Sequence, residues 1–235
     1  MPSSELQVFL IWNKARFLQD KILEDIQNKY NILQVFEIDW PRKSFSDNMT
    51  RFYSKNLRSG FRKASECGRA KFLFIIAIDS SPENVYNNKK GIILNIKAIQ
   101  NKGLYREWTG GGFLVHGSDN EEEAEENILF ILGQNKEEIL KSYNTHWDGK
   151  IKQISCDMPG RKSWESQESF LNFCQKIKEV KQSLIQDDII TIWTMNPAKT
   201  KRLLNLRKPL ICFSKEKLFT KIENKRYRVL LCTSN

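Results

Sequence analysis

The chain has 235 residues, of which 40% are hydrophobic, 28% charged and 11% aromatic. This is the composition of a globular protein, so it excludes wholesale disorder and a fibrous repeat, and the length predicts one or two domains. No apolar run approaches the ~18–20 residues of a membrane-spanning helix, and the first residues lack the pattern of a secretory signal. We therefore expect a cytoplasmic protein without a membrane span.

The net charge of +10 is unevenly distributed. Residues 1–145 carry 20 Lys and Arg against 19 Asp and Glu, whereas residues 146–235 carry 18 against 9. This asymmetry predicts two regions, of which the second either faces an anionic partner or is a basic, solvated surface. The five cysteines are widely spread and include no Cys-x-x-Cys pair, so neither a disulfide framework nor a zinc site is indicated.

Apolar periodicity in the first half of the chain predicts alternating strands and helices. The predicted strands lie at 8–12, 33–38 and 72–78, and the predicted helices at 18–30 and after a capping Ser44. Residues 58–70 are basic and rich in turn formers, residues 79–91 form a polar connection, and residues 92–102 fit either strand or helix.

A further strand and helix follow three consecutive glycines, Gly110 to Gly112. Ser118 with Glu121 predicts a capping box for this helix, which ends at Gly133. The alternation of short elements favours an α+β fold, a ferredoxin-like sandwich, over a doubly wound sheet. We assign this domain to residues 1–140, and a smaller basic α/β region to residues 141–235, with a helix at 166–177 and a strand at 188–194.

His116 is the one residue of this junction that capping does not explain. It is one of two histidines in the chain, and it lies at a strand end, between three glycines and an acid-rich helix start. The acidic first turn suits the positive end of the helix, which accounts for the acids but not for the histidine. An imidazole with a pKa near 6.5 is a suitable nucleophile at neutral pH. Residue type and position alone therefore leave two interpretations of His116 open, a structural or neutral residue and a nucleophile.

The segment Val115-His116-Gly117-Ser118-Asp119, followed by Ala124-Glu125 and an apolar helix face, resembles the active-site segment of nucleoside diphosphate kinases. The resemblance extends over about residues 6–132. It implies that His116 accepts a phosphoryl group from a nucleoside triphosphate and passes it to a diphosphate, with Mg²⁺ bound to the nucleotide. It also implies a homo-oligomer.

The same resemblance assigns phosphate-binding roles to further residues. Tyr53 matches a tyrosine near the family's phosphate site, and Arg106 matches the arginine that precedes the histidine. The first strand followed by a lysine matches the family's start. The expected phosphate or nucleotide ligands are Lys14, Tyr53, Arg62 with Lys63 as its alternative, Arg106 and Ser118.

The sequence departs from the family's pattern after the first strand, where Asn13-Lys14-Ala15 lacks the family's proline and acid, and in the shorter stretch between Arg106 and His116. Two single positions depart as well. Phe113 stands where the family has an asparagine. Asn127 stands where the family has the glutamate that orients the histidine, with Glu126 adjacent. These departures keep a second hypothesis open, in which the domain binds nucleotides or acts as a scaffold without turnover.

A third hypothesis places the chemistry in the C-terminal region. Asp187 and Asp188 resemble the paired carboxylates with which nucleotidyltransferases hold magnesium. Residues 199–228 interleave aromatic and apolar side chains with Lys and Arg, a pattern that fits either single-stranded nucleic acid or packing on the domain.

Overall fold

The computed structural model describes residues 4–53, 60–89, 91–143, 146–155, 167–186, 189–204, 212–213, 219–223 and 228–233. Contacts divide the chain into two units, Met1–Met158 and Pro159–Asn235, and each is described by itself. Among the helices of the described ranges, none is long and apolar enough to cross a membrane.

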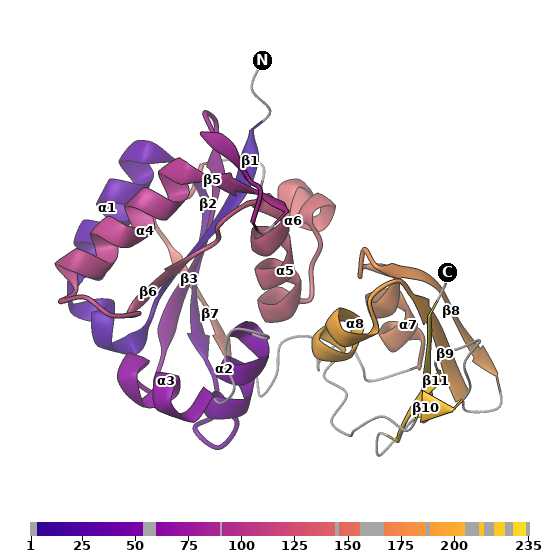
Figure 1. Cartoon of the computed structure of the whole chain (residues 1–235). Helices are drawn as coiled ribbons and strands as arrows, with labels where there is room; N and C mark the ends of the chain where they lie inside the picture. The colour runs from indigo at the N-terminus through magenta and orange to yellow at the C-terminus, as the bar shows by residue number, and fades with distance from the viewer. Residues whose placement is uncertain are drawn as a thin grey trace. The chain divides into compact units, whose positions relative to one another are not determined.

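The first unit is built on a five-stranded sheet in the order β6-β1-β3-β2-β7 (Figure 1). Its strands are β1 (Glu5–Ile11), β2 (Asn31–Asp39), β3 (Phe72–Asp79), β6 (Val115–Gly117) and β7 (Ile151–Ser155). The pairs β1–β3, β1–β6 and β2–β3 are antiparallel, and β7 is parallel to β2. The unit is a mixed α/β structure, and the order β6-β1-β3-β2 is compatible with the predicted ferredoxin-like sandwich.

Helices cover both faces of this sheet. The helices α1 (Gln19–Lys29) and α4 (Ile96–Trp108) lie on one face, and α5 (Glu121–Leu132) and α6 (Lys136–Ser142) on the other (Figure 1). The 3₁₀ turn η1 (Asn13–Leu18) precedes α1, while α2 (Phe45–Tyr53) and α3 (Gly60–Cys67) connect β2 to β3. A hairpin of β4 (Asn84–Asn87) and β5 (Ile92–Asn95) precedes α4.

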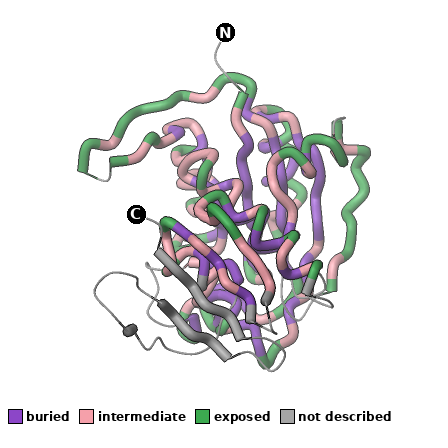
Figure 2. Tube along the Cα trace, turned by 90° about the vertical axis from the view of Figure 1, so that its right-hand side faces the viewer, coloured by how far each residue is buried: buried purple, intermediate pink, exposed green. Residues whose placement is uncertain are grey.

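The central strands β1 and β3 are buried on both sides, and Figure 2 shows buried residues concentrated along the middle of the sheet. Phe9 and Ile11 of β1 pack into the core beneath α1 and α4. The alternate residue Leu10 lies on the opposite face, because successive side chains of a strand point to opposite sides. Burial on both faces explains why these strands are nearly continuous apolar runs.

The helix α3 forms where the sequence predicts only turns. Its first residue, Gly60, packs so closely on α2 that an added Cβ would lie 2.1 Å from the carbonyl oxygen of Ser46. The amide of Gly60 also donates to Oγ1 of Thr50, at 2.6 Å. The contact between the two helices therefore depends on glycine, and this dependence cannot be detected from local sequence.

The prediction that Ser118 and Glu121 form a capping box is wrong. The N-cap of α5 is Asn120, whose Oδ1 accepts from the amide of Glu123 at 2.8 Å. Ser118 instead contacts β1. The ambiguous residues 92–102 divide into β5 and α4, where the N-cap Asn95 accepts from the amide of Ala98 at 3.1 Å.

The first unit extends past the predicted boundary at residue 140. The strand β7 pairs with β2 from Val35 to Asp39, and the amide of Trp147 donates to the carbonyl oxygen of Ile32 at 2.9 Å. Trp147 also packs against the core beneath α1. Residues 141–158 therefore belong with the first domain, and the second begins after Met158.

The second unit contains a five-stranded sheet in the order β10-β11-β12-β9-β8. Its elements are α7 (Gln167–Gln175), β8 (Val180–Gln186), β9 (Ile189–Thr194), α8 (Pro197–Leu203), β10 (Cys212–Phe213), β11 (Phe219–Glu223) and β12 (Arg228–Thr233). The helix α7 and the strand β9 lie where the sequence predicts them. Asp187 and Asp188 lie outside the described residues, and beyond residue 204 the structure describes only the backbone of β10, β11 and β12, so the predicted role of the basic side chains there stays a prediction.

A comparison of two fragments tests the revised boundary. A fragment that ends at residue 140 lacks β7 and Trp147, so it leaves β2 as an uncovered edge strand. We expect it to be less stable than a fragment that ends at residue 158, by about 2 kcal/mol, because it loses the pairing of β7 with β2 and the partly buried side chains of Trp147 and Ile154. Urea unfolding measures the difference, and equal midpoints would contradict the assignment of β7 to the first unit.

Candidate functional site

His116 lies on β6, directly opposite Leu10 of β1, and on the face of the sheet that α5 covers. The residue is only 5% exposed. The strand is held on β1 at both ends, since the amide of Trp12 donates to Leu114 and the amide of Ser118 donates to Val8. His116 therefore lies on a buried strand that backbone hydrogen bonds hold on both sides of the histidine.

Two aromatic rings form walls around the imidazole. The ring centroids of Phe52 and Tyr53 lie 5.2 and 5.4 Å from that of His116, and both rings stand edge-on to it. The indole Nε1 of Trp12 donates to the hydroxyl of Tyr53 at 3.1 Å, which fixes the second wall. The environment of His116 is therefore largely apolar.

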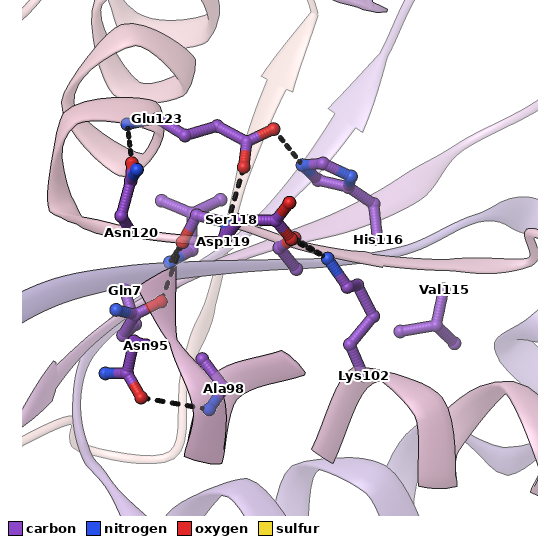
Figure 3. Close-up of polar contacts among 12 residues, drawn as sticks. Gln7, Asn95, Ala98, Lys102, Val115, His116, Ser118, Asp119, Asn120 and Glu123 are labelled. Carbon is purple, nitrogen blue, oxygen red and sulfur yellow. Dashed lines mark hydrogen bonds and ion pairs between the residues drawn. The ribbon is translucent and has the colours of Figure 1, made fainter. Parts of the chain in front are cut away.

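Two side chains of α5 approach Nε2 of the imidazole. The amide Nδ2 of Asn127 lies 3.2 Å from Nε2. Oε1 of Glu123 lies 3.8 Å from the same nitrogen (Figure 3). The second carboxylate oxygen of Glu123 accepts from the amide of Asp119 at 2.6 Å. No hydrogen bond from the described part of the chain reaches Nδ1.

Burial keeps the imidazole neutral. The pKa of His116 lies well below its usual 6.5, first because of burial and then because of the charges of Lys102, Lys63 and Arg106. The pKa of Glu123 is raised, mainly by burial. The contact between His116 and Glu123 therefore joins a neutral imidazole to a carboxyl group and is not an ion pair.

Two half-buried cations lie beside the histidine. Nε of Arg106, from the last turn of α4, donates to the carbonyl oxygen of Val115 at 2.9 Å. Nζ of Lys63, on α3, lies 3.9 Å from the ring centroid of Tyr53. Burial lowers the pKa of both groups. Within the described ranges no acidic side chain pairs with either cation.

The exposed ring of Phe113 covers these two cations. Its centroid lies 4.4 Å from Nζ of Lys63 and 5.2 Å from the guanidinium carbon of Arg106. A third cation, Lys102, differs because it forms an ion pair with Asp119 and donates to the carbonyl oxygen of Gly117 at 3.0 Å (Figure 3). Lys63 and Arg106, the two cations beside His116 without an acidic partner in the described ranges, therefore lie under the ring of Phe113.

The structure brings Tyr53 and Arg106 to His116, as the sequence predicts. It does not bring Lys14 or Arg62 into contact with the histidine. Lys14 is exposed, and its Nζ donates to the carbonyl oxygen of Ser65 at 2.9 Å. Arg62 has a 91% exposed side chain that pairs with Glu66 at 3.0 Å. Its neighbour Lys63 takes the place beside the histidine.

Ser118 lies inside the fold, where its hydroxyl already has partners. The hydroxyl accepts from the amide of Val8 at 3.0 Å and donates to Oε1 of Gln7 at 2.8 Å (Figure 3). The residue is fully buried. These contacts favour a structural role for Ser118, as the link between β1 and the start of α5.

The three glycines end α4 and start the turn into β6. Gly110, Gly111 and Gly112 all have positive φ, of 89°, 88° and 71°, and nothing lies within 4 Å of an added Cβ. They are required for their backbone conformation and not for close packing. The amides of Gly110 and Gly111 donate to the carbonyl oxygens of Glu107 and Arg106, so they are occupied as a helix cap.

Sequence reasoning missed Lys102 and Glu123 and left Lys63 as an alternative. Lys102 and Arg106 are four residues apart, so on a helix they share a face, but residues 92–102 could not be assigned to a helix. Glu123 and Asn127 have the same spacing on α5. That signal was available, since both residues belong to a helix that the sequence predicts.

Comparisons with known proteins give no family and only a weak structural resemblance. A scan against models of protein families finds no match, and a search of curated proteins finds no relative. A search of solved structures finds the nucleoside diphosphate kinase of Aquifex aeolicus, with a TM-score of 0.37, at 16% identity, over 54% of this chain and 93% of that chain. A likeness at this level is only a weak structural resemblance.

Replacement of Ser118 by alanine tests its structural role. The variant leaves the buried amide of Val8 without an acceptor, so we expect a loss of about 1–3 kcal/mol in unfolding free energy. Ser65→Ala, on the exposed surface of α3, is the matched control and should change it by less than about 0.5 kcal/mol. A variant with full stability and weakened nucleotide binding would instead assign Ser118 to the ligand.

Proposed function

We propose that the protein is a phosphotransferase that moves the γ-phosphoryl group of a nucleoside triphosphate through His116. One observation carries the proposal: two half-buried cations, Lys63 and Arg106, flank a neutral histidine and have no acidic partner within the described ranges. Buried positive charge without a counter-charge is costly, and an anion such as phosphate offsets that cost. The resemblance of the segment from Val115 to Asp119 to nucleoside diphosphate kinases supports the same reaction.

The reaction requires a lone pair on the imidazole. Nδ1 forms a bond to the γ-phosphorus while the bond from phosphorus to the bridging oxygen breaks, and the nucleoside diphosphate leaves with that electron pair. A second diphosphate then takes the phosphoryl group by the reverse step. Lys63 and Arg106 stabilise the charge on the transferred group. The resemblance implies that Mg²⁺ arrives on the nucleotide as part of the substrate.

Access to the histidine requires Phe113 to move. Its ring lies over both cations, in the place that the phosphate would occupy. The residue is 53% exposed, and nothing lies within 4 Å of a Cβ added at any of the three preceding glycines. We propose that the incoming phosphate displaces this ring.

A second candidate function is nucleotide binding without turnover. The observation that favours it is the contact of Asn127 with Nε2, since an amide stands where the family has the glutamate that orients the histidine. The nucleotidyltransferase hypothesis rests on Asp187 and Asp188, outside the described residues, and gains no support here. A cytoplasmic location, a homo-oligomer and an anionic partner of the basic region stay predictions.

Labelling of the full chain tests the proposal. We expect purified protein incubated with γ-labelled ATP and Mg²⁺ to acquire a label that is stable in alkali and labile in acid. His116→Asn should abolish the label, whereas His146→Asn, the matched control, should retain it. Nucleotide binding without any label would contradict phosphotransfer and support the second candidate.

Substitution of two adjacent cations, Lys63 and Arg62, tests which of them contacts the phosphate. Lys63 faces the site, whereas Arg62 points into an exposed ion pair. We expect Lys63→Gln to weaken ATP binding or slow labelling by roughly tenfold or more, because hydrogen bonds to charged groups contribute ~1.5–3 kcal/mol. Arg62→Gln should leave both within about twofold. Equal effects of the two changes would contradict the placement of the anion beside Lys63.

A further inference from the structure

Two groups on one face of α5 compete for Nε2 of His116. Asn127 and Glu123 are four residues apart, and their side chains lie 3.2 and 3.8 Å from the same nitrogen. They require opposite protonation of the ring. The amide nitrogen of Asn127 donates to a lone pair on Nε2, whereas a carboxylate accepts a hydrogen that Nε2 carries.

The shorter contact defines the resting form. With the amide of Asn127 donating to Nε2, the hydrogen of the neutral imidazole lies on Nδ1. Neither nitrogen then has a free lone pair. Transfer to Nδ1 therefore needs the other tautomer, with the hydrogen on Nε2, and that N–H needs an acceptor.

Glu123 is anchored in a position to be this acceptor. Its backbone amide donates to the N-cap Asn120 at 2.8 Å, and its Oε2 accepts from the amide of Asp119 at 2.6 Å. Oε1 is left facing Nε2, as Figure 3 shows. A shift of about 1 Å brings it to hydrogen-bond distance. The side chain is 38% exposed, which leaves room for that shift.

We infer that Glu123 is the positioning residue of His116, with a carboxylate that accepts a hydrogen bond from Nε2 in the reactive form of the ring. Asn127 holds the resting form. The hydrogen leaves Nδ1 for water, and Nε2 takes one from water. The lone pair of Nδ1 then bonds to phosphorus, while Nε2 keeps its hydrogen and Glu123 keeps its charge. The effect of Glu123 on the rate of phosphotransfer rests on the proposed function, but its effect on the tautomer of His116 does not.

The tautomer of His116 can be measured without any reaction. Nitrogen chemical shifts of the full chain distinguish the two forms, and we expect the wild type to carry the hydrogen on Nδ1. Asn127→Leu removes the competing amide, so the hydrogen should move to Nε2. The double variant with Glu123→Ala should lose that preference. A ring that stays unchanged in Asn127→Leu, or that changes equally without Glu123, would overturn the inference.

Labelling with γ-labelled ATP gives the second readout. We expect Glu123→Gln to slow labelling at least tenfold. Glu122→Gln is the control, because it removes a carboxylate from an exposed position in the same first turn of α5, and it should label at the wild-type rate. Equal rates in the two variants would overturn the role of Glu123. An unlabelled wild type whose tautomer still depends on Glu123 would instead refute phosphotransfer and leave the positioning role standing.

Discussion

The pairing of β6 with β1 determines where His116 lies, and the rest of the site depends on that register. Leu10 is opposite the histidine, and backbone hydrogen bonds from Trp12 and Ser118 hold the strand on both sides of it. The hydroxyl of Ser118 adds a third link, to the amide of Val8. Because β1 is buried on both faces, a shift of one residue would turn the histidine to the side of α1 and away from α5.

Burial then sets the chemistry of the residues around that histidine. The aromatic walls lower the pKa of His116 and keep it neutral, and the same burial lowers the pKa of Lys63 and Arg106. Low-polarity surroundings strengthen interactions between these cations and any anion that enters. A site built in this way has little affinity for further cations, and it is most stable when a negative group lies between the lysine, the arginine and the imidazole.

Much of the first unit could be predicted from sequence, because its central strands are apolar runs and α1 and α5 have clear helical periods. The strand β7 could not, since its side chains are mostly exposed and show no apolar pattern. Ser118 and Asn120 are both good helix caps, and only the tertiary contact of Ser118 with Val8 decides between them. Arg62 and Lys63 are adjacent cations, so their roles cannot be distinguished before it is known which side of α3 faces the rest of the unit.

Two departures from the kinase pattern, Phe113 and Asn127, lie at the same site, with Phe113 over the two cations and Asn127 against the imidazole of His116. Phe113 covers the cations that a phosphate would contact, and Asn127 occupies the nitrogen that must carry the hydrogen during transfer. Phe113 favours a site closed to anions, and Asn127 favours the unreactive tautomer of the imidazole. Under the proposed phosphotransfer, Phe113 would have to move and the tautomer of the ring would have to change before transfer. In the inferred mechanism, Glu123 favours the tautomer with the hydrogen on Nε2. Its backbone amide makes the N-cap hydrogen bond of α5, so the position of its carboxylate depends on the start of that helix. The other oxygen of the same carboxylate accepts from the amide of Asp119, so one side chain links the start of the helix to the imidazole.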